Sequence, residues 1–275
     1  MVCVNSSGVD IACNVYNKCG GITVVLLHGM PCDSRMYEYQ LPGLIAAGCK
    51  VVTVDFRGYG QSDDTSRGYG YDCLARDLRT CIQKLGLCNI CLAGFDCGGA
   101  VALRYMRLFR GENVRKLLLL SACAPSFTRQ PGYEHGQTKE FVTELITTAM
   151  RDRPQFCYSL VYNYFFSGVN TKSTYADNYF VRLCEDASGL GQVSMLFDLR
   201  DEDGINDLCC VKCPCTIFYG ERDTFLLPDV VRVQQERIRG SKLITLPNSA
   251  HFIVYDELNE FNDRFIAEIV GYDNP

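Results

Sequence analysis

Residues 89–108 read NICLAGFDCGGAVALRYMRL, and this segment carries the sharpest structural signal in the chain. Asn89 to Phe95 is an apolar run typical of a buried strand, whereas Cys97 to Leu108 has the apolar spacing of a helix. A strand that turns directly into a helix holds the residue between them, Asp96, in a strained backbone conformation. Glycines two residues before and two residues after Asp96 relieve the crowding that side chains would cause there. We predict a tight strand–turn–helix unit with Asp96 at its apex.

The same alternation of strands and helices extends along most of the chain. It predicts an α/β fold with a mostly parallel eight-stranded sheet and helices on both faces. The opening segments Val2 to Ser6 and Asp10 to Tyr16 are expected to add an antiparallel hairpin. The other expected strands are Ile22 to Leu27, Lys50 to Phe56, Asn89 to Phe95, Arg115 to Ser121, Thr216 to Tyr219 and Lys242 to Leu246. The expected core helices are Ser34 to Ala47, Tyr71 to Leu85, Cys97 to Leu108, Pro228 to Ile238 and Asp256 to Val270.

The alternation is interrupted once, from Pro125 to about Gly204. This part of the sequence has no buried-strand run and is rich in Tyr and Phe. Its helix-like stretches are Gln137 to Met150, Gln155 to Phe166 and Asn178 to Glu185. We predict that residues 125–204 form a helical cap, inserted into a core made of residues 1–124 and 205–275.

Composition excludes several classes of function. The chain has 275 residues and a net charge of −5, with 47% hydrophobic and 21% charged residues, which is typical of an ordinary globular protein. No basic run is long enough to neutralise several phosphates, so nucleic acid is not an expected partner. No stretch of eighteen apolar residues and no signal-like start occurs, so neither a membrane span nor a signal peptide is expected.

The 17 cysteines have no framework spacing, and their odd number favours reduced thiols and a cytoplasmic location. Cys209, Cys210, Cys213 and Cys215 are crowded, but no histidine lies close to them in the sequence. We therefore expect no metal and no cofactor. The expected partner is a small-molecule substrate, and a homo-oligomer is compatible with the sequence.

Turns that follow the strands of such a sheet are where a ligand would bind. Asp96, Asp223 and His251 follow three expected strands in that order along the chain. A nucleophile, then an acid, then a histidine is the chain order of one type of catalytic triad. The backbone amides of Met30, in the His28 to Pro31 turn, and of Cys97 are the expected donors of an oxyanion hole. An Asp before a helix is also a common N-cap, so the elbow alone does not decide its role.

With these motifs in place, the chain resembles the α/β-hydrolases, closest in pattern to the cofactor-free haloperoxidase, perhydrolase and arylesterase group. The resemblance extends from Asp10 to Val270. It implies a capped hydrolase, although the group nearest in pattern carries serine where this chain has Asp96. Haloalkane dehalogenases and soluble epoxide hydrolases resemble the chain at Asp96, Asp223 and His251. The carrying segments are LLHGMPCDSRMYEYQ, VVTVDFRGYGQSD, CLAGFDCGGAVALRYM, RDRPQFCYSLVYNYFFSG, TIFYGERD and NSAHFIVYDE.

A carboxylate is already ionised at neutral pH and attacks saturated carbon, so Asp96 suits a covalent alkyl ester that water activated by His251 then hydrolyses. The chain has no Trp, whereas dehalogenases of this fold commonly hold halide with Trp N–H groups. Epoxide hydrolases use two cap tyrosines and an HGxP turn. That resemblance makes an epoxide or lactone-like substrate the favoured interpretation. The candidate substrate-binding tyrosines are Tyr158, Tyr162, Tyr164 and, less directly placed, Tyr179.

Three alternatives stay open from the sequence. The scaffold could be a haloperoxidase-like or esterase-like protein whose altered nucleophile leaves weak esterase activity, or a ligand-binding protein without turnover. Cys97 could be the nucleophile, with its pKa lowered by the helix N-terminus.

Other charged residues are expected to be structural. The turn after the second parallel strand is expected to be held by Asp55, Arg57 and Ser62. Asp72 is expected to be a helix-start charge and Asp77 a helix-surface charge. A solvated helix face is expected at Arg104, Arg107 and Arg110.

Overall fold

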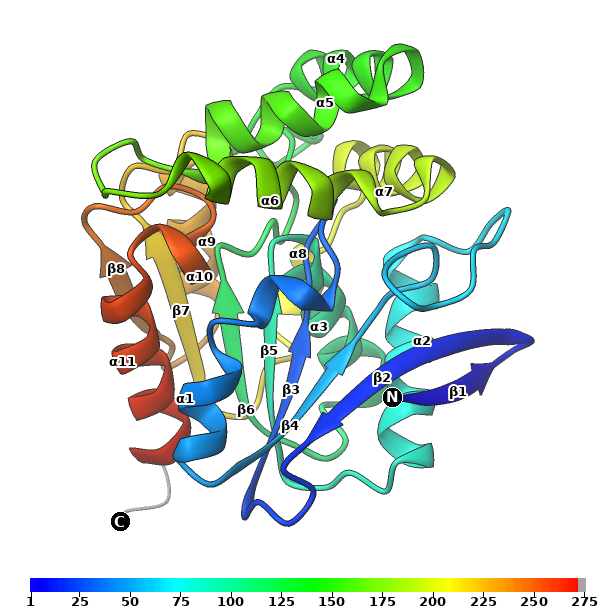
Figure 1. The fold of residues 1–275 in the computed structure, drawn as a ribbon, viewed down its shortest axis with the longest axis vertical. Helices are drawn as coiled ribbons and strands as arrows, with labels where there is room; N and C mark the ends of the chain where they lie inside the picture. The colour runs from blue at the N-terminus through cyan, green and yellow to red at the C-terminus, as the bar shows by residue number, and fades with distance from the viewer. Residues whose placement is uncertain (272–275) are drawn as a thin grey trace.

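The computed structural model describes residues 1–271, and an eight-stranded sheet lies at its centre (Figure 1). The strands lie across the sheet in the order β1-β2-β4-β3-β5-β6-β7-β8. Their bounds are β1 Val2–Ser6, β2 Val9–Tyr16, β3 Ile22–Leu27, β4 Cys49–Val54, β5 Ile90–Phe95, β6 Val114–Leu120, β7 Cys215–Gly220 and β8 Lys242–Leu246. Each predicted strand is therefore present, with ends that differ by two residues at most.

The six strands from β3 to β8 run parallel, and only β2 runs against them. β1 pairs antiparallel with β2, and β2 pairs antiparallel with β4. β3 lies between β4 and β5, and the remaining strands follow in chain order. β5 is buried along its whole length because helices cover both faces of the sheet, which explains its continuous apolar sequence.

Helices cover the two faces of the sheet (Figure 1). α1 and α11 pack together on the face towards the viewer, and α2 and α3 pack together on the face behind. The core helices and helical turns are η1 Ser34–Tyr37, α1 Leu41–Ala46, α2 Tyr71–Lys84, α3 Cys97–Phe109, α8 Ile205–Leu208, α9 Pro228–Arg237, α10 Ile253–Asp256 and α11 Leu258–Val270.

A layer of helices lies across the carboxyl ends of the parallel strands (Figure 1). These helices come from the segment between β6 and β7 that was expected to form a cap. They are α4 Lys139–Arg151, α5 Arg153–Leu160, the π-helical turn η2 Val161–Phe165, α6 Thr174–Glu185 and α7 Gly189–Asp201. The cap therefore covers the same edge of the sheet at which the candidate site residues were expected.

The structure differs from the expected helices at several places. α6 begins at Thr174 and not at Asn178, and the short α8 was not expected. The single helix expected over 34–47 is two, because Pro42 starts a new helix after a short 3-10 turn. The helix expected over 155–166 changes to a π-helical turn at Val161. α7 was not predicted, since its first turn is the glycine-rich Gly189-Leu190-Gly191, but the Ser188 side chain caps it.

Two predictions about surface charges are wrong. Asp77 is buried, not a helix-surface charge, because Arg57 reaches across from another segment and pairs with it at 2.8 Å. Arg104 is buried rather than solvated, and its guanidinium pairs with Asp207 at 2.7 Å and with Glu202 at 3.0 Å. Both errors have one cause, since the partner that makes burial of a charge tolerable lies far away in the sequence.

Within residues 1–271, no helix is long and apolar enough to cross a membrane. None of the 17 cysteines, all within residues 1–271, forms a disulfide, and ten of them are buried.

Candidate active site

The elbow between β5 and α3 has the strained geometry expected from its glycines. Asp96 has φ 51° and ψ −123°, a conformation that a residue with a side chain adopts only when its surroundings impose it. A Cβ at Gly98 would lie 2.4 Å from the carbonyl oxygen of His28, so glycine is required where α3 passes the end of β3. The strain thus fixes the Asp96 side chain at the end of the central strand, below the cap.

The Asp96 carboxylate is fully buried, and its two oxygens have different surroundings. Oδ2 accepts a hydrogen bond from the backbone N–H of Met30 at 3.0 Å. Oδ1 accepts one from the thiol of Cys123 at 2.6 Å. One oxygen therefore occupies an amide site of the kind that stabilises an oxyanion, and the other is directed elsewhere.

His251 lies in the turn between β8 and α10, with Asp223 from the turn after β7 beside it. Nδ1 of His251 is 2.7 Å from Oδ2 of Asp223. The other oxygen of Asp223 accepts the N–H groups of Phe225 and Leu226 at 2.8 and 2.9 Å, which fixes the carboxylate. Asp223 therefore orients the imidazole and leaves Nε2 free to face inward.

Nε2 of His251 is buried, has no hydrogen-bond partner among residues 1–271 and lies 3.7 Å from Oδ1 of Asp96. Burial by itself lowers the pKa of His251, but the charge of Asp223 and the bond to it, with a further contribution from Asp96, raise the pKa to about 9. The imidazole is therefore protonated at neutral pH, between two carboxylates. The structure brings Asp96, Asp223 and His251 into one buried group.

The turn that carries Met30 is held by His28. The backbone N–H of Phe56 donates to Nε2 of His28 at 2.9 Å, so the proton of the neutral ring lies on Nδ1, which donates to the carbonyl of Gly29 at 3.1 Å. Burial lowers the pKa of His28, which keeps the ring neutral. His28 thus has a structural role, and it positions the amide that faces Asp96.

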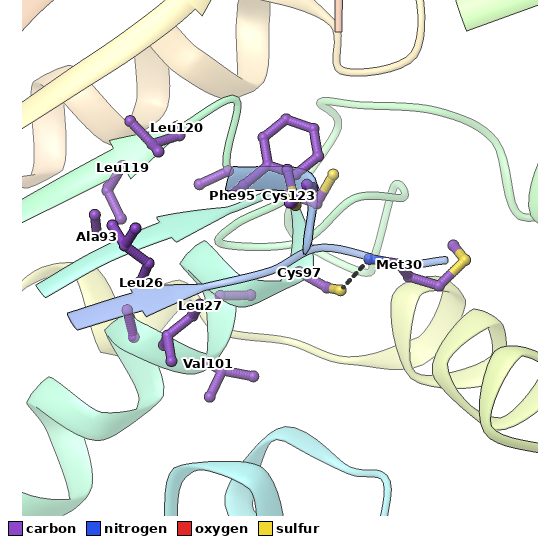
Figure 2. Packing of buried hydrophobic residues seen from close by; sticks show 14 of the residues in the cluster. Leu26, Leu27, Met30, Ala93, Phe95, Cys97, Val101, Leu119, Leu120 and Cys123 are labelled. Carbon is purple, nitrogen blue, oxygen red and sulfur yellow. Dashed lines mark hydrogen bonds between the residues drawn. The ribbon is translucent and has the colours of Figure 1, made fainter. Parts of the chain in front are cut away.

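Cys97 is at the first turn of α3, and its thiol is buried beside the nucleophile position. Its Sγ accepts the Met30 N–H at 3.2 Å, as Figure 2 shows together with the apolar side chains of β3 and β5 around it. Burial and the charge of Asp96 raise the pKa of this thiol well above its ordinary value, opposite to the lowering that a nucleophilic Cys97 needs. Within residues 1–271 the structure shows no hydrogen bond from the Cys97 amide to Asp96. The role of the Cys97 amide as a second oxyanion donor therefore stays a prediction.

The predicted cap tyrosines are not equivalent. The rings of Tyr158 and Tyr162 stack on each other 4.0 Å apart and are 47% and 44% exposed, so they lie outside the buried group around Asp96. Helical spacing alone could not tell which face of the cap points inward. Tyr164 is adjacent to the triad, because its carbonyl accepts the N–H of His251 at 3.2 Å and its ring packs against Phe225.

The sequence reasoning missed three residues. Cys123 lies three residues past the end of β6, the neighbour of β5, and the rule that ligands bind at such strand ends could have singled it out. Tyr59 and Tyr71 are buried, and their hydroxyls have no hydrogen-bond partner in residues 1–271. The pKa of each is raised by burial first and then by charges that include those of Cys97 and Asp96. The Tyr59 ring packs against His28, with the ring centroids 5.2 Å apart.

The turn expected from Asp55 and Ser62 is present. Oδ1 of Asp55 accepts the N–H of Ser34 at 2.9 Å, and Oδ2 accepts that of Gln61 at 3.0 Å. The Ser62 hydroxyl donates to the Asp55 carbonyl at 2.6 Å. These bonds tie the loops after β3 and β4 together, which supports the loop that carries Met30.

Comparison with known proteins identifies what this arrangement is similar to. The sequence model described as the alpha/beta hydrolase family matches residues 24–266. The AB hydrolase superfamily protein YisY of Bacillus subtilis (strain 168) is 38% identical over 242 residues, which is 88% of this chain and 89% of that protein. A shorter match, 37% identical over 103 residues, covers 37% of this chain and 18% of the bifunctional epoxide hydrolase 2 of Sus scrofa.

Solved structures agree with this match over nearly the whole chain. The esterase EaEST from Exiguobacterium antarcticum has a TM-score of 0.93 and 33% identity, covering 97% of this chain and 98% of that one. A bromoperoxidase from Bacillus anthracis has a TM-score of 0.92 and 26% identity, covering 99% of each chain. The predicted capped fold with an eight-stranded, mostly parallel sheet is therefore confirmed.

Proposed function

The chain belongs to the alpha/beta hydrolase family and is a hydrolase of the esterase, haloperoxidase and epoxide hydrolase type; from that premise we propose that it hydrolyses a small electrophilic substrate through an alkyl ester on Asp96. The observation that carries the proposal is that the two oxygens of the Asp96 carboxylate face different groups. Oδ2 accepts the Met30 amide, while Oδ1 faces Nε2 of His251. A carboxylate arranged in this way can use one oxygen to attack and keep the other in the oxyanion site.

In the first step, Oδ1 of Asp96 attacks a saturated carbon of the substrate. A carbon–oxygen bond forms to Asp96, and the bond from that carbon to its leaving atom breaks. The Cys123 thiol, which donates to Oδ1 in the free enzyme, has to turn away as the substrate carbon approaches. Oδ2 becomes the carbonyl oxygen of the new ester and stays beside the Met30 amide.

Ester formation changes the protonation of His251. In the free enzyme, burial disfavours the imidazolium, and the charges of Asp223 and Asp96 more than restore it and raise the pKa of His251 to about 9. An alkylated Asp96 is neutral, so its share of this stabilisation disappears and the pKa of His251 falls. The proton that His251 loses passes to the alkoxide of an opened epoxide, or to water when a halide leaves, and His251 then serves as the neutral base of the second step.

In the second step, neutral His251 removes a proton from water as the water oxygen attacks Cγ of the Asp96 ester. The developing negative charge lies on Oδ2, where the Met30 amide already donates. The ester bond then breaks and the alcohol leaves with the proton from His251. The remaining water proton on the new Asp96 carboxyl group passes to His251, which restores the carboxylate and the protonated imidazole. The sum of the two steps is hydrolysis of the substrate.

The hydrogen-bond donors near the site indicate which leaving atom, an oxygen or a halide, the enzyme could stabilise. Opening of an epoxide produces an alkoxide, which requires nearby hydrogen-bond donors. Tyr59 and Tyr71 have buried hydroxyls without partners in the described chain, and their raised pKa values keep them protonated as donors. The absence of Trp removes the usual halide clamp. These features favour an epoxide, with the core tyrosines as donors instead of Tyr158 and Tyr162.

Simple esterase action is less suited to this nucleophile, because attack of a carboxylate on an ordinary ester gives an anhydride. A binding protein without turnover would not require the His251 imidazole to lie between the Asp96 and Asp223 carboxylates.

The reduced cysteines and the absence of a membrane-spanning helix in residues 1–271 are compatible with a reducing compartment such as the cytoplasm.

A His251→Gln variant tests the proposal, since it can form the ester but cannot activate water. The variant is incubated with a panel of epoxides, haloalkanes and esters, and intact mass is measured. We expect an adduct with the mass of an epoxide on the peptide that contains Asp96, and no adduct in His251→Gln/Asp96→Asn. A wild-type enzyme that turns substrate over while the His251→Gln variant never accumulates an adduct would contradict the alkyl-enzyme.

A further inference from the structure

The buried group at the elbow contains three potential metal ligands, and the proposed hydrolysis uses only two of them, Asp96 and His251. We propose that Oδ1 of Asp96, Sγ of Cys123 and Nε2 of His251 together bind one zinc-like divalent cation, and that the bound cation inhibits the enzyme. The three atoms lie within 4.8 Å of one another, and all three side chains are buried. Binding of the cation does not depend on the proposed reaction, because it concerns the protein without substrate, whereas the inhibition rests on the proposed function.

The spacing of the three atoms is close to that of a tetrahedral zinc site. Zinc bonds of about 2.0–2.3 Å place neighbouring ligand atoms about 3.3–3.7 Å apart. Oδ1 of Asp96 and Nε2 of His251 are 3.7 Å apart, which fits without movement. Sγ of Cys123 is 2.6 Å from Oδ1 and has to move outward by about 1 Å, which a rotation about the Cα–Cβ bond of Cys123 can provide.

The donors and their support also suit zinc. Metal-bound histidines commonly donate their second ring nitrogen to a carboxylate, as Nδ1 of His251 is placed to do with Asp223 at 2.7 Å. Nε2 is buried and has no other partner, so nothing within residues 1–271 competes for it. A thiolate, an imidazole and a carboxylate favour zinc or cobalt over magnesium and calcium, which prefer oxygen ligands only.

Binding of the cation leaves the net charge of the buried site unchanged. The cation displaces the Cys123 thiol proton and the Nε2 proton of His251, and both protons pass to water. Two positive charges leave as one divalent ion enters, and no electron is transferred. The bound ion would occupy both Oδ1 of Asp96 and Nε2 of His251, so substrate and cation exclude each other. Three protein ligands leave a fourth position for water.

Cobalt(II) is the probe, because tetrahedral cobalt with a thiolate ligand has visible d–d bands and a near-ultraviolet charge-transfer band. Reduced full-length protein is titrated with cobalt and then with zinc, which should displace it. We expect one equivalent of thiolate-bound cobalt that disappears in Cys123→Ala and in His251→Gln, with unchanged circular dichroism. Cys13→Ala removes another buried thiol, in β2, and should keep the signal.

The carboxylate behind His251 provides a graded test. Asp223→Asn should weaken zinc binding by about 10- to 100-fold while it leaves the cobalt spectrum in place, since Asp223 orients a ligand but is not one. Cobalt bands of equal strength in wild type, Cys123→Ala and His251→Gln would overturn the site and assign the ion to other thiols, such as Cys209 and Cys210. Absence of any cobalt band from the folded wild-type protein would overturn it as well.

Discussion

Nε2 of His251 lies 3.7 Å from Oδ1 of Asp96, a separation too long for a hydrogen bond but short enough for each charge to control the other. The imidazole is anchored on its far side by Asp223, so it cannot move away from this contact without losing a 2.7 Å bond. The elbow strain fixes the aspartate in the same way. The protonation of His251 is thus coupled to whether Asp96 carries a charge.

This coupling predicts the effect of neutralising Asp96. Asp96→Asn keeps the size of the side chain and removes its charge, as ester formation does, so the pKa of His251 should fall below about 9. The measurement is an NMR titration of the His251 ring protons. Asp229→Asn, which removes a carboxylate near His135 instead, is the matched control and should leave the pKa of His251 unchanged.

The raised pKa of His251 also predicts how stability depends on pH. The folded-state pKa of about 9 exceeds the unfolded value, so the contribution is complete below the unfolded pKa and is lost as pH rises through the folded pKa. Between pH 5.5 and 8, the free energy of unfolding of wild type relative to His251→Gln should fall by about 2 kcal/mol. Denaturant unfolding at both pH values measures it, and a pH-independent difference would refute the charged histidine.

The close packing of Gly29 against the elbow predicts that one methyl group added at this position lowers both stability and activity. A Cβ at Gly29 would lie 2.6 Å from Cβ of Asp96 and 2.7 Å from Cδ1 of Phe95. Gly29→Ala should therefore cost about 1–3 kcal/mol of stability and displace the Met30 amide from Oδ2, with loss of activity. Gly21→Ala, where a Cβ meets nothing within 4 Å, should change stability by less than about 0.5 kcal/mol.

The unpaired hydroxyls of Tyr59 and Tyr71 predict opposite effects on stability and activity. The double variant Tyr59→Phe/Tyr71→Phe loses no hydrogen bond that the folded protein makes within residues 1–271, so its stability should be unchanged or higher by about 1 kcal/mol. Its kcat on an epoxide should fall by about 100-fold, because both donors to the opening oxygen are gone. Tyr162→Phe, on the exposed cap surface, should match wild type in both measurements; equal kcat in all three proteins would exclude the core tyrosines as donors.

Residues fixed by local geometry could be predicted from the sequence, and residues fixed by distant partners could not. The glycines around Asp96 and the strand ends before Asp223 and His251 are local signals, and the structure brings these three side chains together. Cys123 carries no motif, and the only sequence signal for it is its place just past the end of β6, the strand that lies beside β5. Three cap helices were predicted, yet their inward face was not, so Tyr158 and Tyr162 were expected to bind substrate although they are exposed. Tyr59 and Tyr71 were not singled out.

The central claim is that water attacks the carboxyl carbon of Asp96 and not the substrate. A single turnover with excess enzyme in ¹⁸O-labelled water, followed by mass analysis of the peptide that contains Asp96, tests it most directly. We predict that one ¹⁸O atom enters Asp96 and that the oxygen transferred to the product in this first turnover is unlabelled. Measurable turnover with no label in Asp96 and ¹⁸O in the product would contradict the covalent mechanism.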